Sequence, residues 1–282
     1  MTVRTDEWPP QPETTTTSTA GESSGMCSPP SESALPVVVF FHGGGFAYLS
    51  ASSASYDAAC RRIARHAAAA VVSVDYRRSL EHRFPAAYDD GFAALRFLDD
   101  ASNHPLSLDG SRCFLAGDSA SGNIAHHVAR RYALSPSSFR TVRLASLITI
   151  QPFFGGEART PSALRLDGAP VVSTDWMWRA FLPPGADRTH EACDAGMSSP
   201  AAAAGVVDAP QFPPVTVVVG GYDPLQDWQR RYCGALRAKG KEVTLLEYPN
   251  AIHAFYLFPE FKDAKDLMLK IRDIVAGSGR SA

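Results

Sequence analysis

A serine placed between a short apolar run and a helical pattern constrains the fold of this chain more than any other feature. Ser119 follows the apolar run 113–116 and precedes the segment 123–129, whose apolar residues have helical spacing. Together with Gly117 and Asp118, this pattern predicts a tight strand-to-helix turn that exposes the serine hydroxyl as a nucleophile. A free serine is a poor nucleophile near neutral pH, so the turn predicts catalysis only if the chain also supplies a base.

Two residues that could activate the serine follow later apolar runs. The run 215–219 predicts a buried strand and is followed by Asp223, and the strand-like run 243–248 is followed by His253. An imidazole can take the serine proton when a carboxylate holds it in the right tautomer. The chain order serine, aspartate, histidine, with each residue where a strand ends, is that of the α/β-hydrolases. Asp227 is an alternative acid, but it opens a predicted helix, where aspartate commonly serves as an N-cap. We therefore favour Asp223.

A glycine-rich loop supplies a candidate site for the negative charge that develops in such a reaction. The loop follows the apolar run 36–41 and consists of His42, Gly43, Gly44 and Gly45. The amides of Gly43, Gly44 and Ala120 are predicted to face the oxyanion, and each such donor typically lowers the barrier by about 3 kcal/mol. We expect His42 and Gly45 to shape the loop. The sequence around it lacks the patterns that bind nucleotide phosphates, and the predicted chemistry requires no metal or cofactor.

Strand-like apolar runs alternate with helical patterns along most of the chain, which predicts an α/β fold with a mainly parallel sheet. The expected strands lie at 37–41, 71–76, 113–117, 144–150, 215–219 and 243–248. The expected helices lie at 54–65, 87–100, 122–133, 227–238 and 261–275. The segment 151–212 is too long for an ordinary connection, so we expect a cap insertion over the site. Aromatic residues of the cap and of the glycine loop either line the substrate pocket or form a core, and the candidates are Phe46, Trp176, Trp178 and Phe181.

The first 35 residues differ in composition from the domain expected at 36–282. They are rich in Pro, Ser, Thr and Glu and contain few large apolar residues. Such a segment cannot bury enough surface to offset its ordering entropy, so we expect a disordered leader. It has neither a basic start with an apolar core nor an arginine-rich amphipathic pattern, which predicts a cytoplasmic protein, with the nucleus also open.

The overall composition argues against several classes of function. The chain has 282 residues, of which 45% are apolar and 20% charged, and its net charge is −2. It can bury one large core and shows no basic field for nucleic acid. No apolar run approaches the roughly 20 residues of a membrane span. Five cysteines at scattered spacings favour free thiols in a reducing compartment and give no support for zinc. We expect a small-molecule substrate as the partner.

The motifs at 42–46, 74–77, 81–86, 117–123, 223–225 and 253–255 resemble those of the hormone-sensitive-lipase branch of the α/β-hydrolases. The segments 151–157, 175–178 and 181–183 are similar to those of the plant carboxylesterases, a group that includes the gibberellin receptors. The resemblance covers about residues 36–275. It implies an α/β-hydrolase fold with a cap, and a carboxylesterase that hydrolyses small carboxylic esters through Ser119, His253 and Asp223.

Other functions within the same group stay open. The resemblance implies that gibberellin receptors bind a small molecule without turnover, lack the catalytic histidine and close a helical N-terminal lid over the hormone. His253 is present here, which favours an enzyme. The hydroxyisoflavanone dehydratases of the same group use a similar pocket for elimination, so a dehydratase is a further alternative.

Three departures from the family pattern bear on activity. Ser121 stands where the serine turn usually has its last glycine, and residues 78–80 replace the usual Leu-Ala-Pro. Only about 35 residues precede the first family strand, where relatives usually carry a longer segment. We therefore expect the first sheet strands to be missing, and an inactive product is a third alternative.

Overall fold

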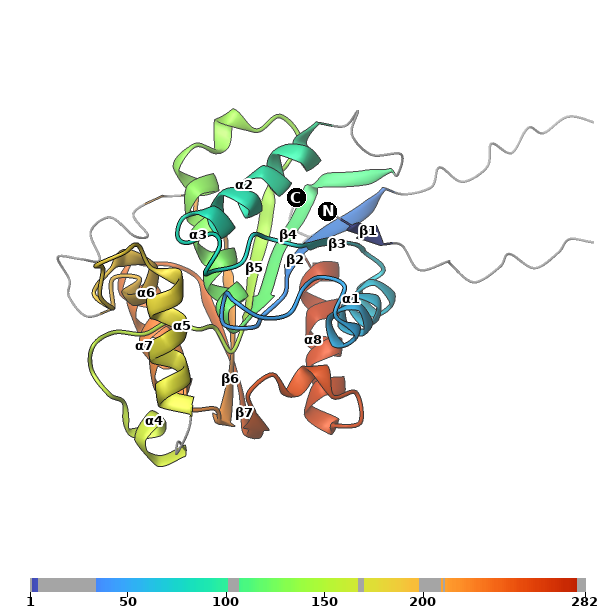
Figure 1. Ribbon diagram of the computed structural model, residues 1–282. Coiled ribbons are helices and arrows are strands. Elements are labelled where there is room, and N and C mark those ends of the chain that lie inside the picture. Colours follow the sequence, from blue (N-terminus) through green and yellow to red (C-terminus); the bar gives the residue numbers. More distant parts are fainter. Residues whose placement is uncertain are drawn as a thin grey trace, which may run out of the picture.

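One seven-stranded sheet organises the protein (Figure 1). The computed structural model describes residues 2–4, 34–100, 107–166, 170–197, 209 and 211–277. The strands are β1 (Thr2–Arg4), β2 (Leu35–Phe41), β3 (Ala70–Val74), β4 (Leu108–Asp118), β5 (Leu144–Ile150), β6 (Val215–Tyr222) and β7 (Val243–Ile252). Their order across the sheet is β1-β3-β2-β4-β5-β6-β7. β2 to β7 run parallel, and β1 pairs antiparallel with β3 at one edge.

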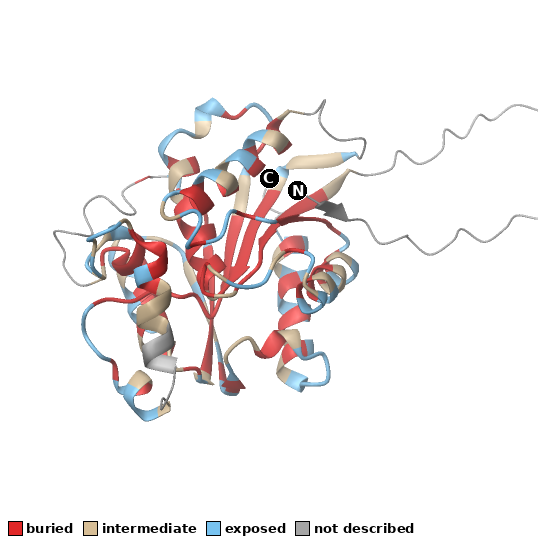
Figure 2. Cartoon of the chain, in the orientation of Figure 1, coloured by how far each residue is buried: buried red, intermediate tan, exposed pale blue. Residues whose placement is uncertain are grey.

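Helices cover both faces of the sheet (Figure 1). They are α1 (Ala54–Ala67), α2 (Ala86–Asp99), α3 (Ala120–Leu134), α4 (Pro161–Leu166), α5 (Pro170–Phe181), α6 (Glu191–Asp194), α7 (Gln226–Ala238) and α8 (Lys262–Gly277). Side chains of a strand alternate between the two faces. Val39 and Phe41 of β2 accordingly join the core formed with α2, α3 and α7, whereas Val38 and Phe40 join the core formed with α1 and α8. Burial on both faces explains why the central strands are near-continuous apolar runs (Figure 2).

The six strands and five helices expected from the sequence are all present, with differences at their ends. β4 begins earlier than expected because Leu108 pairs with Leu35 ahead of a register shift. β7 continues to Ile252 although Pro249 and the following residue favour a turn. A Cβ at Gly221 would lie 2.0 Å from the carbonyl oxygen of Pro249, so this glycine lets β6 and β7 approach closely at their ends. The extension carries β7 to the sheet edge at which β4 and β6 also end.

The leading segment contains one strand that the sequence did not predict. In β1, Thr2 lies opposite Ser73 and Arg4 opposite Val71 of β3. The prediction used the average composition of the leader, and this average did not reveal the short stretch with the two β-branched residues Thr2 and Val3. Residues 5–33 lie outside the described part of the chain, so the disorder expected there stays a prediction.

The segment between β5 and β6 holds α4, α5 and α6. Residues 167–169, 198–208 and 210 of this segment are not described. α5 packs against the glycine loop after β2, because the ring of Phe46 lies 3.9 Å from that of Phe181 and 5.2 Å from that of Trp178, measured between ring centroids. Asp175 of α5 forms ion pairs with Arg159 and Arg188, which lie before and after this helix in the chain. These contacts fix α5 beside the carboxyl edge of the sheet.

Candidate active site

Ser119 occupies the tight turn predicted for it, between β4 and α3. Its backbone angles are φ 54° and ψ −123°, a strained conformation for a residue with a side chain. A Cβ at Gly117 would lie 2.4 Å from the carbonyl oxygen of Ser121, so the turn requires glycine at 117.

Ser121 fits the turn by forming hydrogen bonds in it. Its buried hydroxyl accepts from the amide of Asp118 at 2.9 Å and lies 2.7 Å from the carbonyl oxygen of Phe41, to which it can donate. The serine that replaces the usual glycine thus ties the turn to the end of β2.

His253 and Asp223 lie together at the ends of β7 and β6. Nδ1 of His253 is 2.9 Å from Oδ2 of the fully buried Asp223. The same carboxylate accepts hydrogen bonds from the amide of Leu225 at 2.9 Å and from Nε2 of Gln229 at 2.8 Å. Asp227 instead accepts from the amide of Ser162. Of the two acids considered from the sequence, Asp223 is therefore the one that contacts the histidine.

The charge of Asp223 favours the protonated form of His253. Loss of hydration lowers the pKa of the imidazole, but the charge and hydrogen bond of Asp223, together with the charge of Asp118, outweigh it. The pKa of His253 therefore lies above its ordinary value near 6.5. A base with a raised pKa accepts the serine proton more readily.

Ser119 and His253 line one cavity of about 590 Å³. Most of its wall is apolar and comes from distant parts of the chain. Leu49, Phe153, Met177, Leu225 and Leu257 contribute to it. The candidate nucleophile and the candidate base therefore line the same apolar space, which has the size of a small-molecule site.

The glycine loop forms part of the same cavity through Gly44 and Gly45. Both residues have positive φ, at 114° and 58°. A Cβ at Gly44 would lie 2.2 Å from the carbonyl oxygen of Tyr48, and one at Gly45 would lie 2.3 Å from Sδ of Met177. Ala120 is the first residue of α3, a position whose amide has no acceptor within the helix. These features are compatible with the oxyanion site predicted for Gly43, Gly44 and Ala120.

His42 lies beneath the loop and contacts it through its ring. Its Nδ1 lies 2.9 Å from the carbonyl oxygen of Gly43, and the ring stacks on Tyr76 with centroids 4.3 Å apart. Tyr76 donates a hydrogen bond to the carbonyl oxygen of His42 at 2.8 Å. Burial lowers the pKa of His42, so it is held neutral and supports the loop.

Asp118 connects the serine turn to the glycine loop from below. Its buried carboxylate accepts a hydrogen bond from the hydroxyl of Tyr56 at 3.0 Å. A Cβ at Gly43 would lie 2.5 Å from that hydroxyl and 2.8 Å from Oδ2 of Asp118, so only glycine allows this packing. Burial raises the pKa of Asp118 to about 6, although the charge of His253 and the bond from Tyr56 lower it.

The aromatic residues proposed from the sequence for the pocket do not line this cavity. Phe46, Trp178 and Phe181 are buried and their rings contact one another, so the core alternative describes them. Trp176 stacks on Tyr48, with ring centroids 5.7 Å apart. The rotation of α5 about its axis explains this for the two tryptophans: it places Met177 at the cavity, while the adjacent Trp176 and Trp178 lie on other faces of the helix. Sequence alone does not give that rotation.

Sequence reasoning also missed Tyr56, Gln151 and Gln229, which hold the site together. Tyr56 comes from α1 and carries no local signal. Gln229 lies six residues after Asp223, on the face of α7 that returns to it. Gln151 follows directly after β5, and a polar residue immediately after a buried strand, at the sheet edge that carries the site, is a signal that could have identified it.

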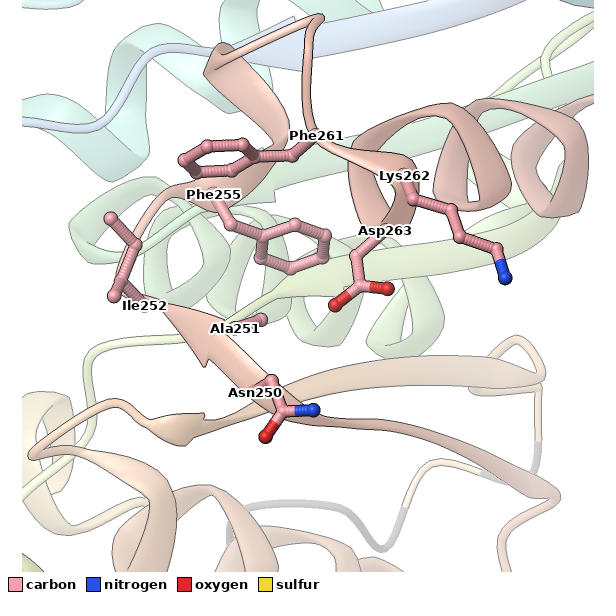
Figure 3. Close-up of a pocket in the computed structure, with 7 residues that line it drawn as sticks. All are labelled: Asn250, Ala251, Ile252, Phe255, Phe261, Lys262 and Asp263. Atoms are coloured by element: carbon pink, nitrogen blue, oxygen red, sulfur yellow. The ribbon is translucent and has the colours of Figure 1, made fainter.

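A second pocket, of about 290 Å³, lies beside the end of β7 and contains none of the predicted site residues (Figure 3). The side chains of Phe255, Phe261 and Asp263 line it. Among the described residues, no group of three His, Cys, Asp or Glu could hold a metal ion. No described helix is long and apolar enough to cross a membrane.

The chain belongs to the family described as the alpha/beta hydrolase fold, whose family model matches residues 38–257. Among solved structures it is similar to the esterase of Pyrobaculum calidifontis, with a TM-score of 0.74 and 28% identity over 88% of this chain and 78% of that one. It is also similar to the thermostable carboxylesterase EstE1 from a metagenomic library, with a TM-score of 0.76 and 27% identity over 88% of this chain and 81% of that one.

Two groups of plant proteins resemble the chain in sequence. The gibberellin receptor GID1C of Arabidopsis thaliana is 45% identical over 76% of this chain and 61% of its own length. Carboxylesterase 20 of the same plant is 35% identical over 77% of this chain and 67% of its own length. The chain thus spans about six tenths of the length of the receptors it matches. The chain is thus an α/β-hydrolase by family, and its plant relatives include both gibberellin receptors and carboxylesterases.

Proposed function

We propose that the protein is a serine carboxylesterase in which Ser119 is the nucleophile, His253 the base and Asp223 the acid. One observation carries this proposal: His253 contacts the buried Asp223 at 2.9 Å and shares a cavity with the strained Ser119. A silent, retained serine turn has no need of a carboxylate-bound histidine in the same cavity. The substrate is a small carboxylic ester bound in that cavity.

The mechanism follows from the positions of the hydrogen-bonding groups. The Asp223 carboxylate accepts a hydrogen bond from the N–H group at Nδ1 of His253, which leaves Nε2 unprotonated and able to take the proton of Ser119. The serine oxygen then attacks the ester carbonyl. The amides of Gly43, Gly44 and Ala120 stabilise the oxyanion, and His253 gives its proton to the departing alcohol. Water, activated by the same histidine, releases the acid from the acyl-enzyme. The segment 151–212 acts as a cap, through which Phe153 and Met177 close one side of the cavity.

Hydrolysis of short p-nitrophenyl esters tests the proposal, with Ser119→Ala as the decisive variant. Turnover should fall by on the order of 1000-fold or more in Ser119→Ala. Ser111→Ala, near the other end of β4, is the matched control and should retain activity. A fluorophosphonate probe should label the wild-type protein and not Ser119→Ala. Turnover that persists in folded Ser119→Ala would exclude this serine as the nucleophile.

A second candidate is the binding of a small molecule without turnover. The 45% identity to a protein named as a gibberellin receptor favours it. Folded protein that neither hydrolyses esters nor reacts with the fluorophosphonate would support this candidate. Product analysis distinguishes the third candidate, a dehydratase, because elimination releases water from the substrate and forms no free acid.

A further inference from the structure

We propose that Gln151 is a positioning residue whose side-chain amide holds the backbone on both sides of His253. The functional importance of this contact rests on the proposed function, in which His253 is the base. The contact itself does not depend on it. Gln151 follows β5, is fully buried and does not line the catalytic cavity.

The two hydrogen bonds of the amide bracket the histidine. Nε2 of Gln151 donates to the carbonyl oxygen of Ile252 at 3.0 Å. Oε1 accepts from the amide of Ala254 at 2.7 Å. Ile252 and Ala254 are the residues directly before and after His253. The side chain of Gln151 therefore fixes the peptide groups on both sides of His253, which determine the position of its Cα and the direction of its side chain.

The chemistry of these partners requires an amide side chain. One partner is an acceptor and the other a donor, which also sets the orientation of the Gln151 amide. A carboxylate in its place could accept from Ala254 but could not donate to Ile252. An apolar side chain of the same length would leave these two partly buried backbone groups without their partners, which is costly.

The surrounding backbone is arranged to admit this side chain. Gln151 has φ 48°, an unfavourable value for a residue other than glycine, and its own amide donates to the carbonyl oxygen of Val218 on β6 at 2.9 Å. A Cβ at Gly220 would lie 2.4 Å from Nε2 of Gln151 and 2.7 Å from the carbonyl oxygen of Ala251. Glycine at 220 therefore leaves the space that the amide fills. Strain at one residue and a reserved space at another indicate a side chain placed for function.

Loss of these two hydrogen bonds should loosen the contact between His253 and Asp223. The charged groups that act on His253 are Asp223, at 2.9 Å, and the buried Asp118. Burial lowers the pKa of the imidazole and both carboxylates raise it, so an imidazole that moves away from Asp223 but stays buried should have a lower pKa. The same displacement moves the base away from Ser119 and should lower kcat, while KM, set by the cavity wall, changes little.

The test compares Gln151→Met with Thr149→Val. Methionine keeps the length of the side chain and removes both hydrogen bonds. Thr149 is a matched control because it is buried near the end of β5, two residues before Gln151, and its hydroxyl donates to the carbonyl oxygen of Thr216. The His253 imidazole is titrated by NMR, with its signal assigned by its loss in His253→Gln. kcat and KM are measured with a p-nitrophenyl ester.

In Gln151→Met, the pKa of His253 should fall by roughly half a pH unit or more, and kcat should fall by about 10- to 100-fold. KM should stay within about twofold, and Thr149→Val should match the wild type in all three values. Should Gln151→Met not fold, Gln151→Asn, which keeps an amide too short for both bonds, takes its place with the same expectations.

Two results would overturn the proposal. The first is an unchanged pKa and kcat in the Gln151 variant. The second is a lower kcat with an unchanged pKa of His253, because that pattern reports a smaller folded fraction and no displacement of the imidazole. A wild-type protein without turnover would refute the esterase proposal alone, since the NMR titration still shows whether Gln151 positions His253.

Discussion

At the scale of single residues, the contact between His253 and Asp223 sets the pH range in which the protein should act. Protonated imidazole cannot accept the serine proton, so kcat/KM should fall as the pH falls through the pKa of His253. That pKa lies above its ordinary value because of Asp223 and Asp118. In Asp223→Asn the acid limb of the pH profile should move to lower pH, and kcat should drop by on the order of 1000- to 10,000-fold.

Asp227→Asn is the matched control for this prediction. Asp227 lies four residues further along the chain and bonds the backbone of Ser162. Its variant should keep the acid limb of the wild type. If Asp227→Asn shifted the limb while Asp223→Asn did not, the assignment of the acid would be wrong.

At the scale of elements, the packing of α5 against Phe46, the residue after the glycine loop, involves two aromatic side chains, and Phe181 lies nearer to Phe46 than Trp178 does. Phe181 is fully buried, and its ring stacks on Phe46. Phe181→Ala should lower the free energy of unfolding by about 3 to 4 kcal/mol, measured by urea denaturation, because it leaves a cavity in this core. Leu164→Ala on α4, whose side chain is 65% exposed, should change it by less than about 0.5 kcal/mol. Equal effects of the two substitutions would contradict this packing.

The elements themselves were largely predictable because burial leaves a regular pattern in the sequence. The five strands β2 to β6 are largely buried and β7 is partly buried, and all six contain apolar runs. Ser119, Asp223 and His253 could be located because each follows such a run. The end of β7 was not predictable, since it depends on the close approach of β6 at Gly221. The rotation of α5 about its axis depends on contacts with Phe46, more than 100 residues earlier.

At the scale of the whole molecule, the cavity is a joint product of segments that the sheet brings to one edge. Leu49 comes from the loop after β2, Met177 from α5 and Leu257 from the segment after β7. A linear sequence contains no signal for such a wall, because each residue alone is an ordinary apolar residue. The sequence therefore predicted that Ser119, Asp223 and His253 lie at one edge of the sheet, but it did not predict the shape of the space around them.

The composition of that wall predicts which esters the protein accepts. No lysine or arginine occurs among the described residues that line the cavity, and Asp118 lies at its base. With a pKa of about 6, Asp118 carries a negative charge at pH 8. A second negative charge on the substrate would enter an apolar space without a cationic partner, at a large desolvation cost.

p-Nitrophenyl hexanoate should therefore be hydrolysed at pH 8 with a kcat/KM at least about 100-fold higher than that for the p-nitrophenyl monoester of adipic acid, a difference of about 2.7 kcal/mol. The two acyl chains have the same number of carbon atoms, so the comparison isolates the charge. In Leu257→Lys, which adds a cation to the cavity wall, the preference should shrink while Leu257→Met leaves it unchanged. Equal rates for the two esters in the wild type would mean that the carboxylate of the anionic ester stays in solvent outside the cavity, and the apolar wall would then not set specificity.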